Sequence, residues 1–265
     1  SLDDRKLAVS RLASWTGTRD IWLYDLSRDT SSRFTFDPST ELSPFWSPDA
    51  SRIVFSSDRA GALDLYQRVA TGGSNDELLL STSDPKYPNH WSPDGRYIVY
   101  ESVDPKTKID LWVLPLFGDR KPILYLQTGS DESQGQISPD GRWMLYQSNE
   151  TGRSEIYVQA FPISGGKWQI STNGGVYPRW RGDGKEIFYL ALDRKMTAVG
   201  IKLGPTPDAS APAELFPTQI SQPFGVRNPY AVTADGQRFL VNARLEEADS
   251  SPIAVVVNWD AGLKK

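Results

Sequence analysis

Short apolar and aromatic runs recur along the whole chain, and polar turn residues separate them. Runs such as Arg52-Ile-Val-Phe55 and Glu186-Ile-Phe-Tyr189 are rich in β-branched and aromatic residues, which is typical of strands. Nowhere does an apolar period of about 3.6 residues persist for three turns, so we expect helices to be few and brief. The pattern therefore predicts an all-β protein.

One turn pattern that contains Asp repeats along the chain. Its copies are Trp46-Ser-Pro-Asp-Ala50, Trp91-Ser-Pro-Asp-Gly95, Ile137-Ser-Pro-Asp-Gly141, Trp180-Arg-Gly-Asp-Gly184 and Val232-Thr-Ala-Asp-Gly236, and Ser1-Leu-Asp-Asp4 opens a sixth copy. The anchoring aspartates are Asp3, Asp49, Asp94, Asp140, Asp183 and Asp235. By subtraction they are spaced 46, 45, 46, 43 and 52 residues apart. These intervals match a four-stranded propeller blade of about 40 to 45 residues.

Each copy is interpreted as a turn between the first and second strands of a blade. A third strand such as Asp110-Leu-Trp-Val113 and a short fourth strand such as Ile123-Leu-Tyr-Leu126 follow it. One such sheet cannot bury both of its apolar faces, whereas six sheets around an axis cover one another. We therefore predict a six-bladed β-propeller with four-stranded antiparallel blades around a central channel, as a single domain over residues 1–265.

Three further expectations follow from the repeat. Trp46, Trp91 and Trp180 share one repeat position and are expected to pack between blades. The segment Gly204-Pro-Thr-Pro-Asp-Ala-Ser-Ala-Pro212 accounts for the longest interval and is interpreted as a surface loop. The first copy lacks the strand before its turn, so we expect the chain to be a fragment of a longer one whose preceding residues complete the last blade.

Composition narrows the possible classes of function. Hydrophobic residues make up 38% of the chain, which is enough for a folded core. The 29 basic and 33 acidic residues give a net charge of −4 without a Lys/Arg-rich run, so nucleic acid is a poor candidate partner. No apolar run approaches the roughly 18 residues of a membrane span. There is no Cys, and the single His90 excludes multi-His zinc sites and is the base that any catalytic triad must use.

The loops that join the fourth strand of one blade to the first strand of the next are expected to crowd one mouth of the channel. They bring the carboxylates of Asp37, Glu41, Asp84, Asp131 and Glu132 to one end, facing Arg227 and Asn228. His90 and Arg179 share the repeat position before the Trp, where the residue varies while its neighbours repeat. We take these nine residues as candidate ligand-binding residues and His90 as the catalytic candidate. The structural alternative is that His90 and Arg179 only bond carbonyls and water in the channel.

Carboxylates that converge on a channel mouth suit a hard cation such as Ca²⁺. Turn loops are rich in Asp for backbone reasons as well, and no Asp-x-Asp-x-Asp-Gly loop is present. We therefore assign no cofactor and leave Ca²⁺ or another divalent cation as the open alternative. The sequence also lacks a Gly-x-Ser-x-Gly elbow and a Walker-type phosphate loop.

The repeated Trp-Ser-Pro-Asp-Gly, followed by Arg-Tyr-Ile-Val-Tyr and Asp-Leu-Trp-Val, closely resembles the repeats of TolB-like propellers. Longer stretches, among them Gly141-Arg-Trp-Met-Leu-Tyr-Gln-Ser148 and Glu155-Ile-Tyr-Val-Gln-Ala-Phe-Pro162, are similar to the C-terminal propeller region that follows the membrane span of certain bacterial transmembrane serine/threonine kinases. This resemblance implies a bacterial, extracytoplasmic sensor or scaffold domain without kinase activity. Ala50 in place of the turn Gly, and Arg181-Gly-Asp183 in place of Ser-Pro-Asp, depart from the repeat.

Three functional hypotheses remain open. The first is a noncatalytic, monomeric binding module that holds a protein, a peptide or a small ligand at the channel mouth. The second is a divalent-metal-dependent hydrolase of esters, lactones or phosphoesters, in which loop carboxylates hold the ion and His90 shuttles protons. The third is a structural spacer without a ligand. Whether the chain is an enzyme is left open, with the binding module as the leading hypothesis.

Overall fold

The computed structural model describes residues 1–265 except 2, 14–16, 74, 221–227, 244–253 and 257–265. The chain forms two compact units, Ser1–Ile137 and Ser138–Lys265. Every regular element of the described residues is a strand, which confirms the all-β prediction. None of the described residues belongs to a helix long and apolar enough to cross a membrane. The extent of the chain as one domain stays a prediction.

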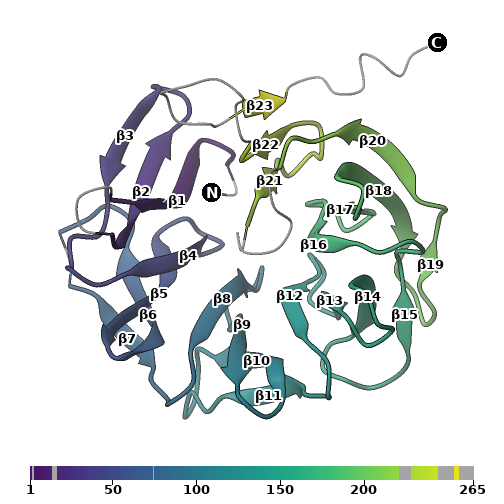
Figure 1. Ribbon diagram of the computed structural model, residues 1–265, viewed down its shortest axis with the longest axis horizontal. Helices are drawn as coiled ribbons and strands as arrows, with labels where there is room; N and C mark the ends of the chain where they lie inside the picture. Colours follow the sequence, from purple (N-terminus) through teal and green to yellow (C-terminus); the bar gives the residue numbers. More distant parts are fainter. Residues whose placement is uncertain (2, 14–16, 74, 221–227, 244–253, 257–265) are drawn as a thin grey trace. The chain divides into compact units, whose positions relative to one another are not determined.

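The first unit contains three antiparallel sheets and one further strand (Figure 1). In each sheet the strands lie in chain order, because hairpins connect neighbouring strands. The sheets are β1 (Lys6–Leu12), β2 (Arg19–Asp25) and β3 (Thr30–Arg33); β4 (Glu41–Trp46), β5 (Arg52–Ala60), β6 (Ala62–Val69) and β7 (Glu77–Leu80); and β8 (Lys86–Trp91), β9 (Tyr97–Asp104), β10 (Lys108–Pro115) and β11 (Ile123–Leu126). Strand β12 (Glu132–Ile137) ends this unit.

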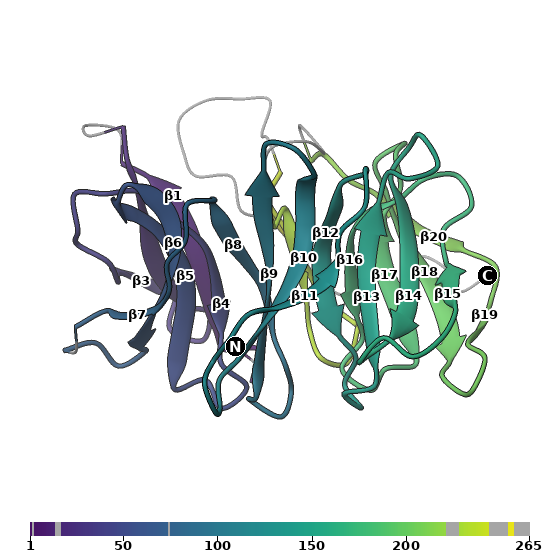
Figure 2. The same cartoon turned by 90° about the horizontal axis from the view of Figure 1, so that it is seen from below.

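The second unit repeats this hairpin order, and its strands run side by side in Figure 2. Its strands are β13 (Trp143–Ser148), β14 (Glu155–Ala160) and β15 (Lys167–Gln169); β16 (Val176–Trp180), β17 (Glu186–Leu190), β18 (Lys195–Lys202), β19 (Asp208–Ala209) and β20 (Ala213–Pro217); and β21 (Tyr230–Val232), β22 (Phe239–Val241) and β23 (Ala254–Val256). The expected loop at residues 204–212 contains β19, which pairs with the same edge of β18 as β20 does. The insertion therefore splits the fourth strand of this sheet in two.

The Asp-containing turns adopt one backbone conformation in both units. In the turn before β5, Ser47 Oγ donates to Asp49 Oδ1 at 2.6 Å, and the backbone N–H of Ser51 donates to the same oxygen at 3.0 Å. The residue after the aspartate lies in the left-handed region, with φ of 56° at Ala50 and 75° at Gly141. This geometry explains why four of the six copies carry Gly there. The interpretation of the repeat as a turn is confirmed.

The apolar faces of neighbouring sheets pack against each other within each unit. In the first unit Trp91 belongs to a core cluster with Val54 and Leu65 of the preceding sheet. In the second unit Trp180 clusters with Trp143 and other buried residues of β13 and β14. These repeated tryptophans therefore fill the space between sheets, as the sequence predicts.

The prediction of six blades with four strands each is wrong. Five blades are present, and strands β2, β5, β9, β13 and β17 in the middle of these sheets have five to nine residues. The number of strands differs from blade to blade. Where the sixth blade was expected, β21, β22 and β23 have only three residues each. The sequence gives a physical reason. This last copy has Val232 in place of the packing Trp and lacks the Ser-Pro pair that presets the turn, so it offers less apolar surface for a full blade.

Candidate functional site

The loop end of a blade is the end at which the chain passes from the last strand of one sheet to the first strand of the next. In the first unit the loop before β4 meets the hairpin that joins β5 and β6. The backbone N–H of Thr40 donates to Asp58 Oδ1 at 2.8 Å, and the backbone N–H of Asp58 donates to the carbonyl of Thr40 at 3.3 Å. Loop residues and hairpin residues therefore form one joint surface at this end.

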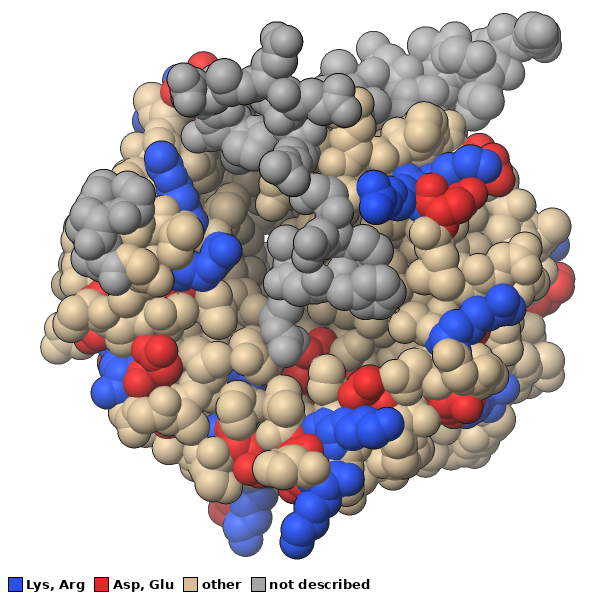
Figure 3. All heavy atoms as spheres, in the orientation of Figure 1, with Lys and Arg blue, Asp and Glu red and all other residues tan. Residues whose placement is uncertain are grey.

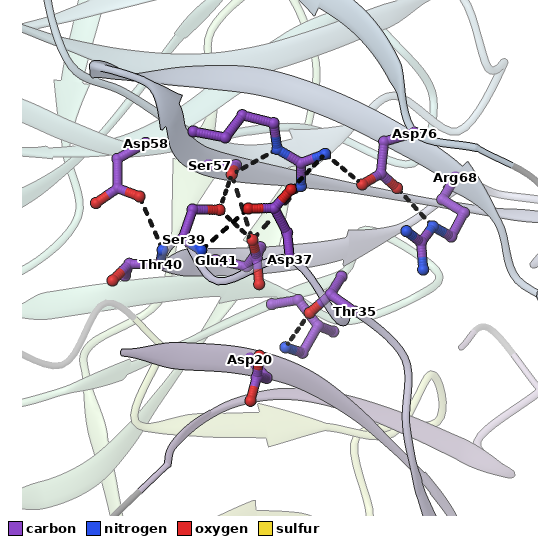
Figure 4. Close-up of polar contacts among 12 residues, drawn as sticks. Asp20, Thr35, Asp37, Ser39, Thr40, Glu41, Ser57, Asp58, Arg68 and Asp76 are labelled. Atoms are coloured by element: carbon purple, nitrogen blue, oxygen red, sulfur yellow. Dashed lines mark hydrogen bonds and ion pairs between the residues drawn. The ribbon is translucent and has the colours of Figure 1, made fainter. Parts of the chain in front are cut away.

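Glu41, the first residue of β4, is fully buried at this loop end (Figure 4). Its Oε1 accepts hydrogen bonds from Ser39 Oγ at 2.7 Å and from Ser57 Oγ at 3.3 Å. The Arg59 Nη2 donates to the same oxygen at 3.4 Å. The other oxygen, Oε2, is buried and has no hydrogen-bond partner among the described residues. Half of this carboxylate is therefore desolvated without compensation.

Arg59 connects Glu41 to a second carboxylate. Its Nη1 donates to Asp76 Oδ2 at 2.6 Å and lies 3.9 Å from Asp37 Oδ2. Its guanidinium also covers the ring of Tyr66 at 4.5 Å. On the other side of Asp76, Arg68 Nε donates to Oδ1 at 2.5 Å. Two arginines and three carboxylates thus form one connected network, which we call the Arg59 network.

Burial and hydrogen bonding shift the pKa values in this network in opposite directions. Loss of water around Glu41 raises the pKa of its carboxyl group, although Ser39, Thr35 and Arg59 partly oppose the shift. For Asp37, the hydrogen bond from Ser39 is the largest cause that lowers the pKa, and the charges of Arg59 and Arg68 add to it. A carboxyl group with a raised pKa therefore lies beside one with a lowered pKa.

The loop before β8 holds Asp84, but its charged centre is a different residue. Lys86, at the repeat position of Glu41, is 1% exposed and its Nζ donates to Asp64 Oδ1 at 2.9 Å. The same ammonium group donates to the backbone carbonyl of Asp84 at 2.6 Å. The side chain of Asp84 accepts a hydrogen bond from Ser83 Oγ at 3.3 Å and is half-buried. Asp84 therefore contributes to this loop through its backbone carbonyl.

Asp131 and Glu132 lie at the start of β12. Glu132 is 1% exposed, and Thr128 Oγ1 donates to its Oε1 at 2.6 Å. Asp131 is half-buried. Glu132 therefore repeats the burial of Glu41 at the same repeat position, with a threonine hydroxyl in place of the serines.

His90, on β8, contacts the neighbouring strand and an aromatic ring. Its Nδ1 accepts a hydrogen bond from the backbone N–H of Ile137 at 3.2 Å, which assigns the proton of the neutral ring to Nε2. Its ring makes an edge contact with Phe45 at 5.7 Å. A proton transfer at this residue would therefore use Nε2, because Nδ1 accepts from the backbone. A catalytic role for His90 stays a prediction.

The remaining predicted site residues belong to the second unit. Arg179, on β16, is 9% exposed and donates from Nη1 to the carbonyl of Pro178 at 2.7 Å and from Nη2 to Asn228 Oδ1. Its guanidinium covers the ring of Tyr230 at 5.7 Å, and burial lowers the pKa of Arg179. Arg227 lies outside the described residues. The structure therefore brings Arg179 and Asn228 together, and it brings Asp37 and Glu41 together through Arg59.

A set of acidic residues near the start of the third strand in four blades was not recognised from the sequence. Each is nearly inaccessible to water and accepts hydrogen bonds from neighbouring strands or loops. The set is Asp20, Asp64, Asp110 and Glu155. For example, Arg33 Nη2 donates to Asp20 at 2.8 Å, and Gln127 Nε2 donates to Asp110 at 3.0 Å. Their signal was the acidic residue near the start of these four strands, as in Asp110-Leu-Trp-Val113.

Charged side chains of both signs lie next to each other in both units. Across the described part of the chain, no three His, Asp or Glu side chains are placed to hold a metal ion together. On the face drawn in Figure 3, Lys and Arg side chains lie beside Asp and Glu side chains. Ion pairs among the described residues include Arg142 with Asp140 at 2.8 Å and Arg181 with Asp183 at 2.6 Å. Binding of a divalent cation stays a prediction.

Comparison with known families identifies the repeat. Residues 1–112 match the family model described as the TolB beta propeller domain. The Tol-Pal system protein TolB of Wolinella succinogenes is 30% identical over 110 residues, which are 42% of this chain and 25% of that protein. An uncharacterized peptidase of Bacillus subtilis, YuxL, is 33% identical over 104 residues, which are 35% of this chain and 15% of that protein. The chain thus spans a quarter or less of the length of these two relatives.

Solved structures extend the likeness in fold beyond the matched residues. The crystal structure of TolB from Acinetobacter baumannii has a TM-score of 0.76 and 17% sequence identity, and the match covers 97% of this chain and 62% of that one. At this identity the match establishes the fold alone. The resemblance to the bacterial kinases stays a prediction. The resemblance to TolB-like propellers is confirmed over residues 1–112, and the fold of the chain is that of a β-propeller.

Proposed function

We propose that this chain is a noncatalytic binding module that holds a protein or peptide partner at the loop end of its blades, outside the cytoplasm. The TolB-like repeat supports the class of module. Because fold alone does not define a ligand, the evidence for a partner comes from the residues of the loop end.

The exposure of Phe36 is the observation that carries this proposal. Phe36 lies in the loop between β3 and β4, and 66% of its surface is exposed, the largest fraction among the exposed large hydrophobic residues of the described chain. The guanidinium of Arg33 lies 5.2 Å from its ring, and the next residue is Asp37 of the Arg59 network. Protein interfaces concentrate their binding energy in aromatic and arginine side chains of this kind.

The network behind Phe36 supports the same function. Hydrogen bonds fix three polar side chains of this loop end. The backbone N–H of Ser39 donates to Asp37 at 3.0 Å, Ser39 Oγ donates to Glu41, and Asp58 accepts from the backbone N–H of Thr40. A surface whose side chains are already fixed loses little conformational entropy when a partner binds. The loop therefore presents an apolar anchor on a rigid polar support.

Retention of a specific partner by the immobilised protein tests this function. Bacterial envelope extract is passed over the wild-type chain, the Phe36→Ser variant and the Phe117→Ser variant, and retained proteins are quantified by mass spectrometry. Phe117 is a matched control, because it is 44% exposed and lies 4.3 Å from the guanidinium of Arg96, but belongs to the β10–β11 connection. We expect at least one partner whose retention falls about tenfold or more with Phe36→Ser alone. Equal retention of every protein by all three forms would contradict the proposal.

A second measurement separates binding from catalysis. The purified chain is assayed against ester, lactone and phosphoester substrates with Ca²⁺, Mn²⁺, Zn²⁺ or EDTA. We expect no turnover above the rate of a heat-denatured sample. Activity that EDTA or His90→Ala abolishes would replace the proposed function by the metal-dependent hydrolase.

A further inference from the structure

The second unit contains a hollow at the loop end of the sheet β13–β15. It has a volume of about 460 Å³ and is lined by Thr151, Gly152, Arg153, Glu155 and Gln169. The hairpin between β13 and β14 contributes the first three residues, and Glu155 and Gln169 come from β14 and β15. We call it the Arg153 hollow. It is independent of the Arg59 network, which belongs to the first unit.

The acidic group in the lining is already neutralised. Glu155 is 1% exposed, and its Oε1 accepts from Arg153 Nε at 2.6 Å. Its Oε2 accepts from Ser171 Oγ and, at 3.0 Å, from the backbone N–H of Gly174. Both carboxylate oxygens therefore point to donors of the protein, so Glu155 has little capacity left for a cationic ligand.

Arg153, in contrast, keeps unused donors. Its Nη2 donates to the carbonyl of Thr172 at 2.8 Å, which together with the bond to Glu155 fixes the plane of the guanidinium group. Nη1 makes no hydrogen bond to the described residues, and the side chain is 51% exposed. A guanidinium group has five N–H donors in a planar fork, and such a fork binds carboxylates in a bidentate manner.

A buried tyrosine hydroxyl lies beside the hollow. Tyr157, which is 2% exposed, pairs with Gln169 across β14 and β15, and its hydroxyl interacts with Thr151 and Glu150. The nearby Glu150 is engaged by Lys167 at 2.5 Å. Burial and the charge of Glu150 raise the pKa of Tyr157, which keeps this donor protonated.

We propose that the Arg153 hollow binds a carboxylate group of a peptide or protein partner. The proposal rests on the proposed binding function and specifies a recognition site for it. Arg153 Nη1 supplies the charged donor. The hydroxyl of Thr151 donates to the carbonyl of Arg153 at a long 3.4 Å, and a bound carboxylate offers it a stronger acceptor. Gly152 leaves open space above the backbone, since a Cβ atom there would meet no atom within 4 Å. A ligand that presents two acceptor oxygens complements this set of donors.

The test is an NMR titration with two peptides that differ in one group, acetyl-Ala-Glu-Ala-amide and acetyl-Ala-Gln-Ala-amide. We expect the Glu peptide to shift the signals of the Gly152 amide and the Arg153 Nε–H group in a saturable manner, with the Gln peptide binding about tenfold more weakly or less. Arg153→Gln should abolish the difference between the peptides. Arg142→Gln is the matched control, because Arg142 is 73% exposed and pairs with Asp140 outside the hollow.

Two results would overturn this proposal. One is equal affinity for both peptides, and the other is no saturable shift with the Glu peptide up to about 10 mM. If Arg153→Gln fails to fold, Thr151→Val replaces it, and an unchanged affinity of that variant for the Glu peptide would also count against the site. The retention experiment with Phe36→Ser tests a residue of the first unit, whereas the peptide titration tests the second unit. A negative result in one experiment therefore does not decide the other.

Discussion

Arg59 and Arg153 both come from the hairpin between the second and third strands of a blade, but they use their guanidinium groups differently. In the first unit, Arg59 is 20% exposed and engages Asp76, Glu41 and Ser57. In the second unit, Arg153 is 51% exposed, engages Glu155 and the carbonyl of Thr172, and lines a hollow. The same hairpin thus fills the loop end in one unit and leaves it open in the other.

The difference shows how a repeat protein separates stability from recognition. Asp76 and Glu41 are nearly inaccessible to water, so Arg59 supplies a charge that they need in order to stay buried. Glu155 has hydroxyl and backbone donors besides Arg153, so part of that guanidinium is available to a ligand. The number of donors around the buried acid decides which role the arginine has.

The largest effect is expected for Arg59→Met. The variant leaves Glu41 without its nearest positive charge and leaves Asp76 with Arg68 alone, so we expect the free energy of unfolding to fall by about 3 kcal/mol. Urea unfolding followed by tryptophan fluorescence measures the change. A loss below about 1 kcal/mol would show that the network does not depend on Arg59.

Arg153→Met should cost less. Because Ser171 and Gly174 still donate to Glu155, we expect a loss of about 1.5 kcal/mol in the same unfolding experiment. The comparison between the two hairpins predicts the order of the two values. If Arg153→Met destabilises the chain more than Arg59→Met does, Arg153 is a structural residue and the distinction drawn above is wrong.

Glu41→Gln tests the cost of the buried carboxylate. The pKa of Glu41 is raised in the folded chain, so folding favours the protonated form and the native chain loses stability as pH rises above the ordinary range of Glu. The amide cannot lose a proton, so the variant should lack this decline and be more stable at pH 7 by about 1 kcal/mol. Unfolding free energies from pH 4 to pH 8 measure it. A constant difference over this range would contradict the assignment to Glu41.

The smallest effects are expected for the turn aspartates, which both units share. Hydrogen bonds lower the pKa to about 2 in Asp49, chiefly from Ser47, and in Asp183, chiefly from Arg181. Their stabilising contribution is present above the ordinary pKa of Asp and disappears as pH falls towards about 2. Because water screens these exposed groups, Asp49→Asn and Asp183→Asn should each cost only about 0.5 kcal/mol at pH 7. Thermal melts at pH 7 should show small differences of similar size for the two variants, and these differences should shrink at pH 2.5.

The sequence predicted those features that depend on neighbouring residues. The turn at Asp49 needs only Ser47, Ser51 and a residue that accepts positive φ, and all of them lie within five positions. The strands after each turn and the inter-sheet position of Trp91 follow from local apolar patterns in the same way. The number of full blades did not follow, because β21 to β23 depend on how much apolar surface a degenerate copy can bury.

The site was less predictable, because its contacts join distant residues. Arg59 and Asp76 are 17 positions apart, and their contact requires the β5–β6 and β6–β7 connections to be placed correctly. The first strand of several blades also contains a backbone irregularity that the local sequence does not indicate. Ser43, Gln134 and Tyr177 have positive φ angles of 52°, 58° and 56° although none is Gly. In β16 the register shifts between Val176 and Arg179, so counting alternate residues does not predict which way Arg179 points.

The outer edges of the sheets have a consequence for self-association. Strands β3, β7 and β11 have four residues each, and β15 has three. An edge this short offers a foreign chain only a few backbone hydrogen bonds, and the interrupted edge formed by β19 and β20 offers no continuous row. A protein assembled from many sheets can thereby avoid acting as a template for fibril growth, even with an apolar residue such as Leu78 exposed on one of these edge strands.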